Sequence, residues 1–132
     1  MKTLLTTLAV AVVATMGTAV AGEYADISLT ELKDAIGKKE VVVLDVNGTT
    51  TYAKNHIPSA IDFRANKDKL AEMLPENKET LIVAYCGGPS CSAYKAAADA
   101  AKGLGYTNVK HFSGGIKGWL DAGEETHHAQ KQ

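Results

Sequence analysis

Two nearly continuous apolar runs dominate the hydrophobic pattern of this chain, one at residues 41–46 and one at residues 81–86. Neither run alternates with polar residues, as a strand with one solvated face does. We therefore predict two buried strands that are covered on both faces. A further strand is predicted at residues 108–112, and residues 57–61 are expected to be extended.

Helical periodicity fills the stretches between these strands. Leu29, Leu32 and Ile36 recur on one helical face, which predicts an amphipathic helix. A capping box at residues 28–31 opens this helix and Gly37 ends it. Further helices are predicted at residues 66–74, 92–104 and 115–122, with a short helical piece at 50–54.

The alternation of strands and helices is typical of the α/β class. It predicts a mostly parallel central sheet with helices on both faces and right-handed crossovers. Within the helix predicted at residues 66–74, the side chains of Leu70, Met73 and Leu74 are expected to face the core. Residues 22–123 are enough for one hydrophobic core and one domain.

The two ends of the chain have a different composition from this domain. Residues 1–21 combine a positive start at Lys2, an apolar stretch and a small-residue cleavage pattern that ends at Ala21. These features are typical of a secretory signal peptide, so the protein is expected to be periplasmic or secreted. Retention of this segment as a membrane anchor is the alternative. Residues 124–132 are polar and are expected to form a flexible tail.

The distribution of charge excludes several classes of partner. The chain has 14 basic and 15 acidic residues and a formal net charge of −1. Its lysines are scattered rather than clustered, which argues against a polyanion-binding surface. We therefore expect no nucleic-acid partner, and no membrane partner once the signal peptide is removed. In an oxidising compartment the two cysteines of the chain could pair.

The candidate chemistry lies directly after the second apolar run. That run delivers Cys86 to a glycine-rich loop, which a predicted helix follows. The N–H groups of such a loop and the positive end of the helix dipole favour a thiolate, the nucleophilic form of cysteine. The candidate substrate-binding loop consists of Gly87, Gly88, Pro89, Ser90, Cys91 and Ser92. The alternative is that Cys86 is a small core residue at the end of a strand.

Six short motifs follow one another along the chain. They are Asp45-Val46, Tyr52, His56-Ile57-Pro58-x-Ala60, the Tyr85-Cys86 loop, Gly105-Tyr106-x-Asn108-Val109 and Gly114-Gly115-Ile116-x-x-Trp119. Each motif is weak alone, but their order and spacing together resemble the rhodanese-like domain family, in particular the single-domain sulfurtransferases. The resemblance covers residues 27–123.

This resemblance implies both a fold and a reaction. The fold is a small rhodanese-like α/β domain, and Cys86 matches the cysteine that accepts a sulfane sulfur as a persulfide. The sulfur comes from thiosulfate, a polysulfide or a persulfide donor, and passes to a thiol or cyanide acceptor. We expect no metal and no organic cofactor, because sulfur itself is nucleophile, carrier and leaving group.

Cys91 is the main departure from the family pattern. Many family members carry an arginine at this sixth loop position, so a weaker grip on thiosulfate is expected and polysulfide or protein-bound persulfide becomes a competing donor. Cys91 could instead act as a resolving cysteine that attacks a Cys86 persulfide and releases sulfide. The resulting disulfide would need an external reductant to reopen it. The alternative is that Cys91 packs under the start of the following helix.

Asp45 and His56 complete the candidate site as supporting residues. Asp45 ends the strand predicted beside that of Cys86, and its side chain is expected to bond the loop backbone. His56 precedes a proline turn and is expected to bond backbone there. His111, on a predicted strand, is expected to be structural or exposed. The spacing of the cysteines with His56 or His111 matches no familiar zinc site.

Two other enzyme classes fit the loop poorly. Phosphatases with a similar loop need an arginine where this chain has Ser92, and thioredoxin-like proteins need two residues between their cysteines rather than four. Two alternatives to sulfur transfer stay open. One is a non-catalytic rhodanese-like binding module, and the other is a thiol-disulfide redox protein that uses Cys86 and Cys91.

Overall fold

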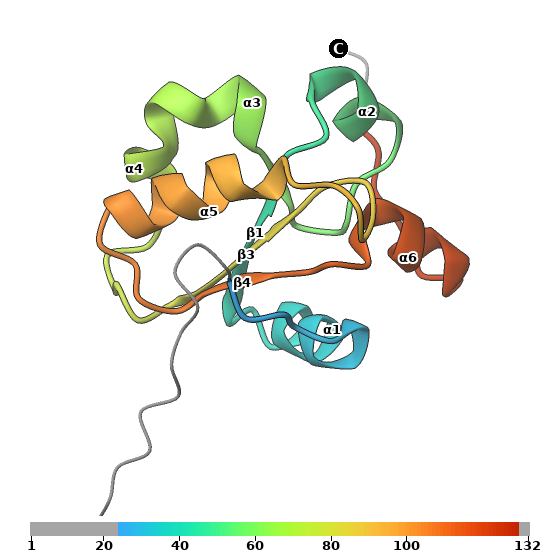
Figure 1. Ribbon diagram of the computed structural model, residues 1–132, viewed down its shortest axis with the longest axis horizontal. Helices are drawn as coiled ribbons and strands as arrows, with labels where there is room; N and C mark the ends of the chain where they lie inside the picture. The colour runs from blue at the N-terminus through green and yellow to red at the C-terminus, as the bar shows by residue number, and fades with distance from the viewer. Residues whose placement is uncertain (1–23, 130–132) are drawn as a thin grey trace, which may run out of the picture.

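The computed structural model describes residues 24–129 of the chain. These residues form a four-stranded parallel sheet in the order β2-β1-β3-β4, with helices on both faces (Figure 1). The predicted α/β class and its mostly parallel sheet are thus confirmed. The signal peptide predicted at residues 1–21 lies outside the described residues.

The two apolar runs are the central strands of this sheet. The strands are β1 (Val41–Asp45), β2 (Ile61–Asp62), β3 (Leu81–Tyr85) and β4 (Val109–His111). In β3, Ile82 and Ala84 belong to one buried cluster, whereas Val83 and Tyr85 belong to the cluster on the opposite face. Because both faces of the strand are covered, both sets of side chains are apolar or nearly so, which explains the lack of alternation.

Two helical layers supply these clusters. The helical segments are α1 (Leu29–Gly37), α2 (Thr49–Lys54), α3 (Phe63–Asn66), the 3-10 helix η1 (Lys67–Lys69), α4 (Leu70–Met73), α5 (Tyr94–Gly103) and α6 (Gly115–Asp121). Helices α3, α4 and α5 cover one face, and α1 and α6 lie on the other side of the sheet (Figure 1). Among the described residues, no helix has both the length and the apolar character needed to cross a membrane.

The region between β1 and β3 differs most from the sequence prediction. Only Ile61 within the segment predicted to be extended is in a strand, and the helix predicted at residues 66–74 is replaced by α3, η1 and α4. The Asp62 carboxylate caps α3 by accepting the Ala65 N–H at 3.2 Å, so helical structure begins earlier than periodicity indicates. Leu70 is buried as predicted, but Met73 is 41% exposed because the helical turns do not form one continuous face.

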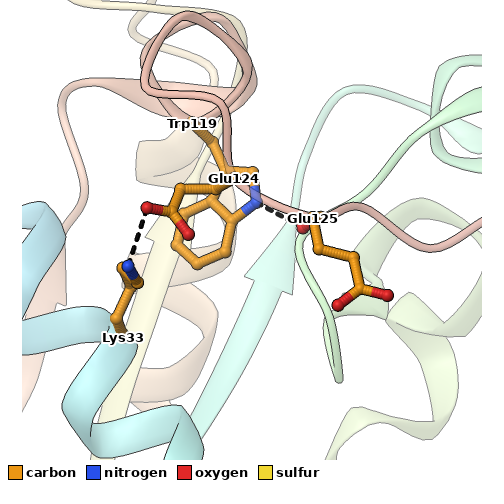
Figure 2. A network of polar contacts seen from close by, with 4 residues as sticks. All are labelled: Lys33, Trp119, Glu124 and Glu125. Atoms are coloured by element: carbon orange, nitrogen blue, oxygen red, sulfur yellow. Dashed lines mark hydrogen bonds and ion pairs between the residues drawn. The ribbon is translucent and has the colours of Figure 1, made fainter.

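The polar C-terminal segment packs against the domain as far as residue 129. Lys33 and Glu124 form an ion pair at 2.7 Å, and the Trp119 indole N–H donates to the Glu125 carbonyl at 2.7 Å (Figure 2). His127 exchanges two backbone hydrogen bonds with His56, at 3.0 and 2.9 Å. Residues 124–129 of the segment predicted to be a flexible tail therefore make defined contacts with the domain.

Candidate active site

Cys86 is the first residue after β3, at the carboxyl edge of a central strand. Its side chain is 1% exposed and packs in the cluster between the sheet and α5. Parallel strands end at the same edge of a sheet, so the segments that follow β1, β2 and β3 all meet near this cysteine. The position predicted for the candidate nucleophile is thus the one it occupies.

A disulfide joins Cys86 to Cys91 across the loop. The two Cα atoms are 6.3 Å apart, within the usual range for a disulfide. Cys91 is half-buried and packs against the same apolar cluster as Cys86. The structure therefore brings together the two sulfur atoms whose pairing the sequence left open, and it shows the loop in its oxidised form.

The backbone of the loop is rich in unpaired donors. The Cys91 N–H donates to the Gly88 carbonyl at 3.1 Å and closes a turn over residues 88–91. Within the part of the chain that the structure describes, the N–H groups of Gly87, Gly88 and Ser90 donate to no backbone acceptor. Helix α5 begins at Tyr94 rather than at the predicted Ser92. The chain thus leaves several main-chain donors beside Cys86, a common feature of anion sites.

Helix α6 donates two backbone hydrogen bonds to the start of the loop. The Ile116 N–H donates to the Cys86 carbonyl at 2.9 Å, and the Lys117 N–H donates to the Gly87 carbonyl at 3.0 Å. Gly115 makes this approach possible, because a Cβ atom there would lie 2.5 Å from the Cys86 carbonyl oxygen. Its φ of 61° also favours glycine. Sequence reasoning assigned the Gly114-Gly115 pair no positioning role, although two adjacent glycines before a helix were the available signal.

Asp45 is fully buried beside the loop but does not bind it. Its carboxylate accepts the Asn47 N–H at 2.8 Å and the Tyr85 hydroxyl. The Tyr85 oxygen in turn accepts the Ile57 N–H at 3.1 Å. Burial raises the pKa of Asp45, and the hydrogen bonds from Tyr85 and Asn47 to its carboxylate oppose that rise. The expected bond from Asp45 to the Cys86 loop is therefore wrong, and Asp45 braces β1 against β3 and the turn at Ile57.

His56 has the structural position that the sequence predicts. Its Nδ1 lies 2.8 Å from the Tyr52 carbonyl oxygen, and its ring stacks on Tyr52 with centroids 3.8 Å apart. The side chain is nearly buried, and none of its described hydrogen bonds reaches the Cys86 loop. His56 therefore supports the fold of the α2 turn.

His111 is buried at the end of the edge strand β4, on the other side of β3 from β1. Its ring stacks on Tyr94, which starts α5, with centroids 3.4 Å apart, and its Nε2 has no hydrogen-bond partner among the described residues. Burial lowers the pKa of His111. Of the two alternatives that the sequence allowed, structural or exposed, the structure shows the first. No group of three or more possible metal ligands occurs among the described residues.

The fold and this loop define a class: an α/β domain that presents a cysteine at the carboxyl edge of a parallel sheet. The sequence matches the Rhodanese-like domain family over residues 28–122, and the chain belongs to that family. This membership confirms the resemblance that the six sequence motifs indicated.

Similar proteins agree on the fold and differ in their named activities. The chain is 33% identical over 101 residues to a tRNA uridine(34) hydroxylase of Photorhabdus laumondii subsp. laumondii, a match that covers 72% of this chain and 27% of that protein. The thiosulfate sulfurtransferase of Pseudomonas aeruginosa superposes with a TM-score of 0.64 at 25% identity, over 81% of this chain and 20% of that one.

The BH2092 protein of Bacillus halodurans superposes with a TM-score of 0.62 at 28% identity, over 80% of this chain and 77% of that one. The chain spans about a quarter of the length of the curated hydroxylases that it matches. Family membership and these neighbours together establish the rhodanese-like family and fold of the domain.

Proposed function

We propose that this protein is a sulfurtransferase that carries a sulfane sulfur as a Cys86 persulfide. The observation that carries the proposal is the position of Cys86, directly after a central strand and beside unpaired main-chain N–H groups. Donors of this kind stabilise a thiolate, an anionic sulfur donor and a persulfide alike.

The reaction has two displacement steps at sulfur. With thiosulfate as donor, the Cys86 thiolate attacks the sulfane sulfur, the sulfur–sulfur bond of the donor breaks and sulfite leaves. The thiolate of an acceptor, or cyanide, then attacks the outer sulfur of the persulfide, and the Cys86 thiolate leaves. Polysulfide and protein-bound persulfides are alternative donors. The two steps give ping-pong kinetics.

Cys91 offers a second fate for the persulfide. Its thiolate can attack the inner sulfur, which is Cys86 Sγ, so that hydrosulfide leaves and the Cys86–Cys91 disulfide forms. An external dithiol then reduces this disulfide and is itself oxidised. The disulfide between the two residues supports this step, because it shows that the loop can bring both sulfur atoms into bonding contact.

Transfer assays on the reduced protein test the proposal. We expect thiosulfate or polysulfide to sustain transfer to cyanide or to a thiol, and Cys86→Ser to abolish it. Cys91→Ser is the matched control: it should retain transfer to an external acceptor and lose hydrosulfide release in the absence of that acceptor. Transfer by Cys86→Ser at the wild-type rate would contradict the proposal.

A thiol-disulfide redox protein is the second candidate, and the observed disulfide favours it. In that case the oxidised protein would exchange with a dithiol at a high rate, and the reduced protein would take up no sulfur from either donor. A non-catalytic binding module would show neither reaction. The relatives named as hydroxylases are much longer proteins, and this chain spans 27% of one of them.

We propose further that the protein is exported and that residues 1–21 are removed after Ala21. The apolar leader and its small-residue ending support this proposal. Cell fractionation followed by intact mass determination tests it. A periplasmic or secreted product that begins at Gly22 is expected, and a cytoplasmic product of full length would contradict it.

A further inference from the structure

The loop around Cys86 contains no charged side chain. Residues 86–92 are two cysteines, two glycines, a proline and two serines. A sulfur donor such as thiosulfate carries two negative charges. Main-chain N–H groups alone distinguish poorly between such an oxyanion and other anions. Positive side chains near the loop must therefore come from other elements of the fold.

Two such side chains line a cavity beside the loop. The cavity has a volume of about 420 Å³ and lies between α3, η1 and the start of α5; its lining residues are Val46, Phe63, Arg64, Lys67, Ala93 and Ala96. Val46 and Phe63 belong to the same buried cluster as Cys86. Ala93 is two residues beyond Cys91. The cavity thus combines apolar and cationic lining residues, and it reaches the segment that directly follows the loop at Ala93.

Arg64 is the only arginine of the whole sequence. It follows β2 by two residues, so it lies at the same sheet edge as Cys86. Its side chain covers Gly48 in the turn after β1, with the guanidinium Nε and Nη1 each 4.0 Å from the position that a Gly48 Cβ would occupy.

Neither cation at the cavity is neutralised. No carboxylate of the described residues lies within 4.0 Å of Arg64 or Lys67, whereas three lysines elsewhere in the described chain form ion pairs. Asp62, two residues before Arg64, accepts the Ala65 N–H at 3.2 Å instead, and Asp68, next to Lys67, forms no ion pair with either cation among the described residues. Arg64 and Lys67 are therefore available to an anion.

A further polar side chain, Asn47, lies against the loop itself. Asn47 contacts the loop, with its Oδ1 3.9 Å from the position that a Gly87 Cβ would occupy. Its Nδ2 is buried and has no hydrogen-bond partner among the described residues. An unpaired buried donor is unfavourable, and a ligand acceptor next to the loop would satisfy it.

From these observations we infer that Arg64 and Lys67 form a subsite for the sulfonate end of an oxyanion sulfur donor, of which thiosulfate is the simplest. The inference deepens the proposed function and depends on it for the reaction, though not for the binding. The guanidinium fork of Arg64 donates two parallel N–H groups to two oxygens, and Lys67 adds a second charge. A polysulfide has no oxygens and gains only the charge attraction.

Binding is tested first on the oxidised wild-type protein, in which the disulfide blocks transfer. A titration with sodium thiosulfate, followed by NMR and compared with sodium chloride at equal ionic strength, should shift the amide signals around Arg64, Lys67 and Ala93. We expect Arg64→Gln to weaken binding about tenfold and Lys67→Gln about threefold. Lys69→Gln is the matched control, since it removes the same charge from η1 outside the cavity and should change binding less than about twofold.

Transfer kinetics on the reduced protein test the donor class. With Arg64→Gln, the KM for thiosulfate should rise about tenfold while kcat changes less than about twofold, and the KM for polysulfide should change less than about threefold. Equal effects of Arg64→Gln and Lys69→Gln on thiosulfate binding would overturn the subsite. Thiosulfate binding that depends on Arg64, without sulfur uptake by the reduced protein, would leave the subsite standing and refute the proposed function.

Discussion

At the scale of single residues, the Tyr85 hydroxyl connects three parts of the fold next to the loop. It donates to the buried Asp45 carboxylate and accepts the Ile57 N–H. We expect Tyr85→Phe to lower the free energy of unfolding by about 1–3 kcal/mol, because it leaves a buried carboxylate and a backbone donor without this partner. Urea denaturation measures the loss. Tyr52→Phe, which removes a bond to the Ala60 carbonyl, is the control and should lose less.

The pH dependence of this loss identifies Asp45 as its cause. Burial raises the pKa of Asp45, and the hydrogen bond from Tyr85 lowers it. Removal of that hydrogen bond should therefore raise the pKa of Asp45 further. A folded-state pKa above the unfolded value makes the ionised group destabilising at higher pH, and this disadvantage disappears as pH falls through the folded pKa. The stability difference between wild type and Tyr85→Phe should therefore shrink on acidification. A constant difference would exclude Asp45.

His111 gives a second pH-dependent prediction, with the opposite sign. Burial lowers its pKa below the ordinary value of 6.5. Stability should therefore fall as pH drops below that value, because the unfolded chain takes up the proton first. We expect His111→Phe, which retains an aromatic partner for Tyr94, to flatten the decline between about pH 7.5 and pH 5.5. His127→Gln, at an exposed position, is the control. An unchanged slope in His111→Phe would contradict this role.

Residue positions set by hydrophobic pattern were predictable, and polar partnerships were not. Leu32, Cys86 and Leu70 are buried as their patterns indicate. The bond between Asp45 and Tyr85 joins residues 40 positions apart, and only the register of β1 with β3 brings them together. For the same reason the unpaired Nδ2 of Asn47 had no signal in the sequence.

At the scale of elements, the close contact between α6 and the Cys86 loop is the feature most sensitive to substitution. Gly115→Ala would place a Cβ atom 2.5–2.7 Å from backbone atoms of residues 86–88 at a φ of 61°. We expect a loss of about 3 kcal/mol in stability and a displaced loop with reduced transfer. Gly118→Ala, in the same helix with nothing within 4 Å, should leave both unchanged or stabilise the helix slightly. Thermal denaturation and transfer rates of the two variants distinguish these outcomes, and equal behaviour would contradict the packing argument.

The elements themselves were predictable where one periodicity runs through a whole segment. Helix α1 has a helical periodicity and strands β1 and β3 are continuous apolar runs, and their predicted bounds agree with the structure to within about a residue. The segment from Phe63 to Met73 lacks it, because the Asp62 cap and the 3-10 turn interrupt the helix. Local capping therefore overrode the apolar spacing that predicted a single helix.

At the scale of the whole molecule, the disulfide links the chemistry of the loop to the stability of the domain. It closes a small ring with a sequence separation of 5. A ring of this size lowers the conformational entropy of the unfolded chain and so raises its free energy by about 2 kcal/mol. Reduction of the disulfide should therefore lower the free energy of unfolding by about that amount. Denaturation with and without a dithiol measures the effect. The variant with both Cys86→Ser and Cys91→Ser should not respond to the reductant, and a wild type that also fails to respond would contradict a stabilising disulfide.

The overall architecture was predictable from the alternation of elements, whereas the docking of the C-terminal segment was not. Residues 124–129 are mostly polar, and their contacts include Lys33, Ala53 and His56, which precede their partners by more than 70 positions. Hydrophobic pattern carries no information on such backbone and ion-pair contacts. Trp119 is buried in the cluster that also contains Leu32 of α1, and nothing in the sequence indicated the bond from its indole N–H to the Glu125 carbonyl.

The proposed reaction requires Cys86 to accept a sulfane sulfur. Intact mass spectrometry tests it most directly, on protein reduced with a dithiol, freed of reductant and exposed to thiosulfate or polysulfide without an acceptor. We expect the Cys91→Ser variant to gain one sulfur atom, located on Cys86 by peptide mapping, and Cys86→Ser to gain none. A Cys91→Ser protein that keeps a free, unmodified Cys86 thiol with both donors would rule out Cys86 as the sulfur carrier.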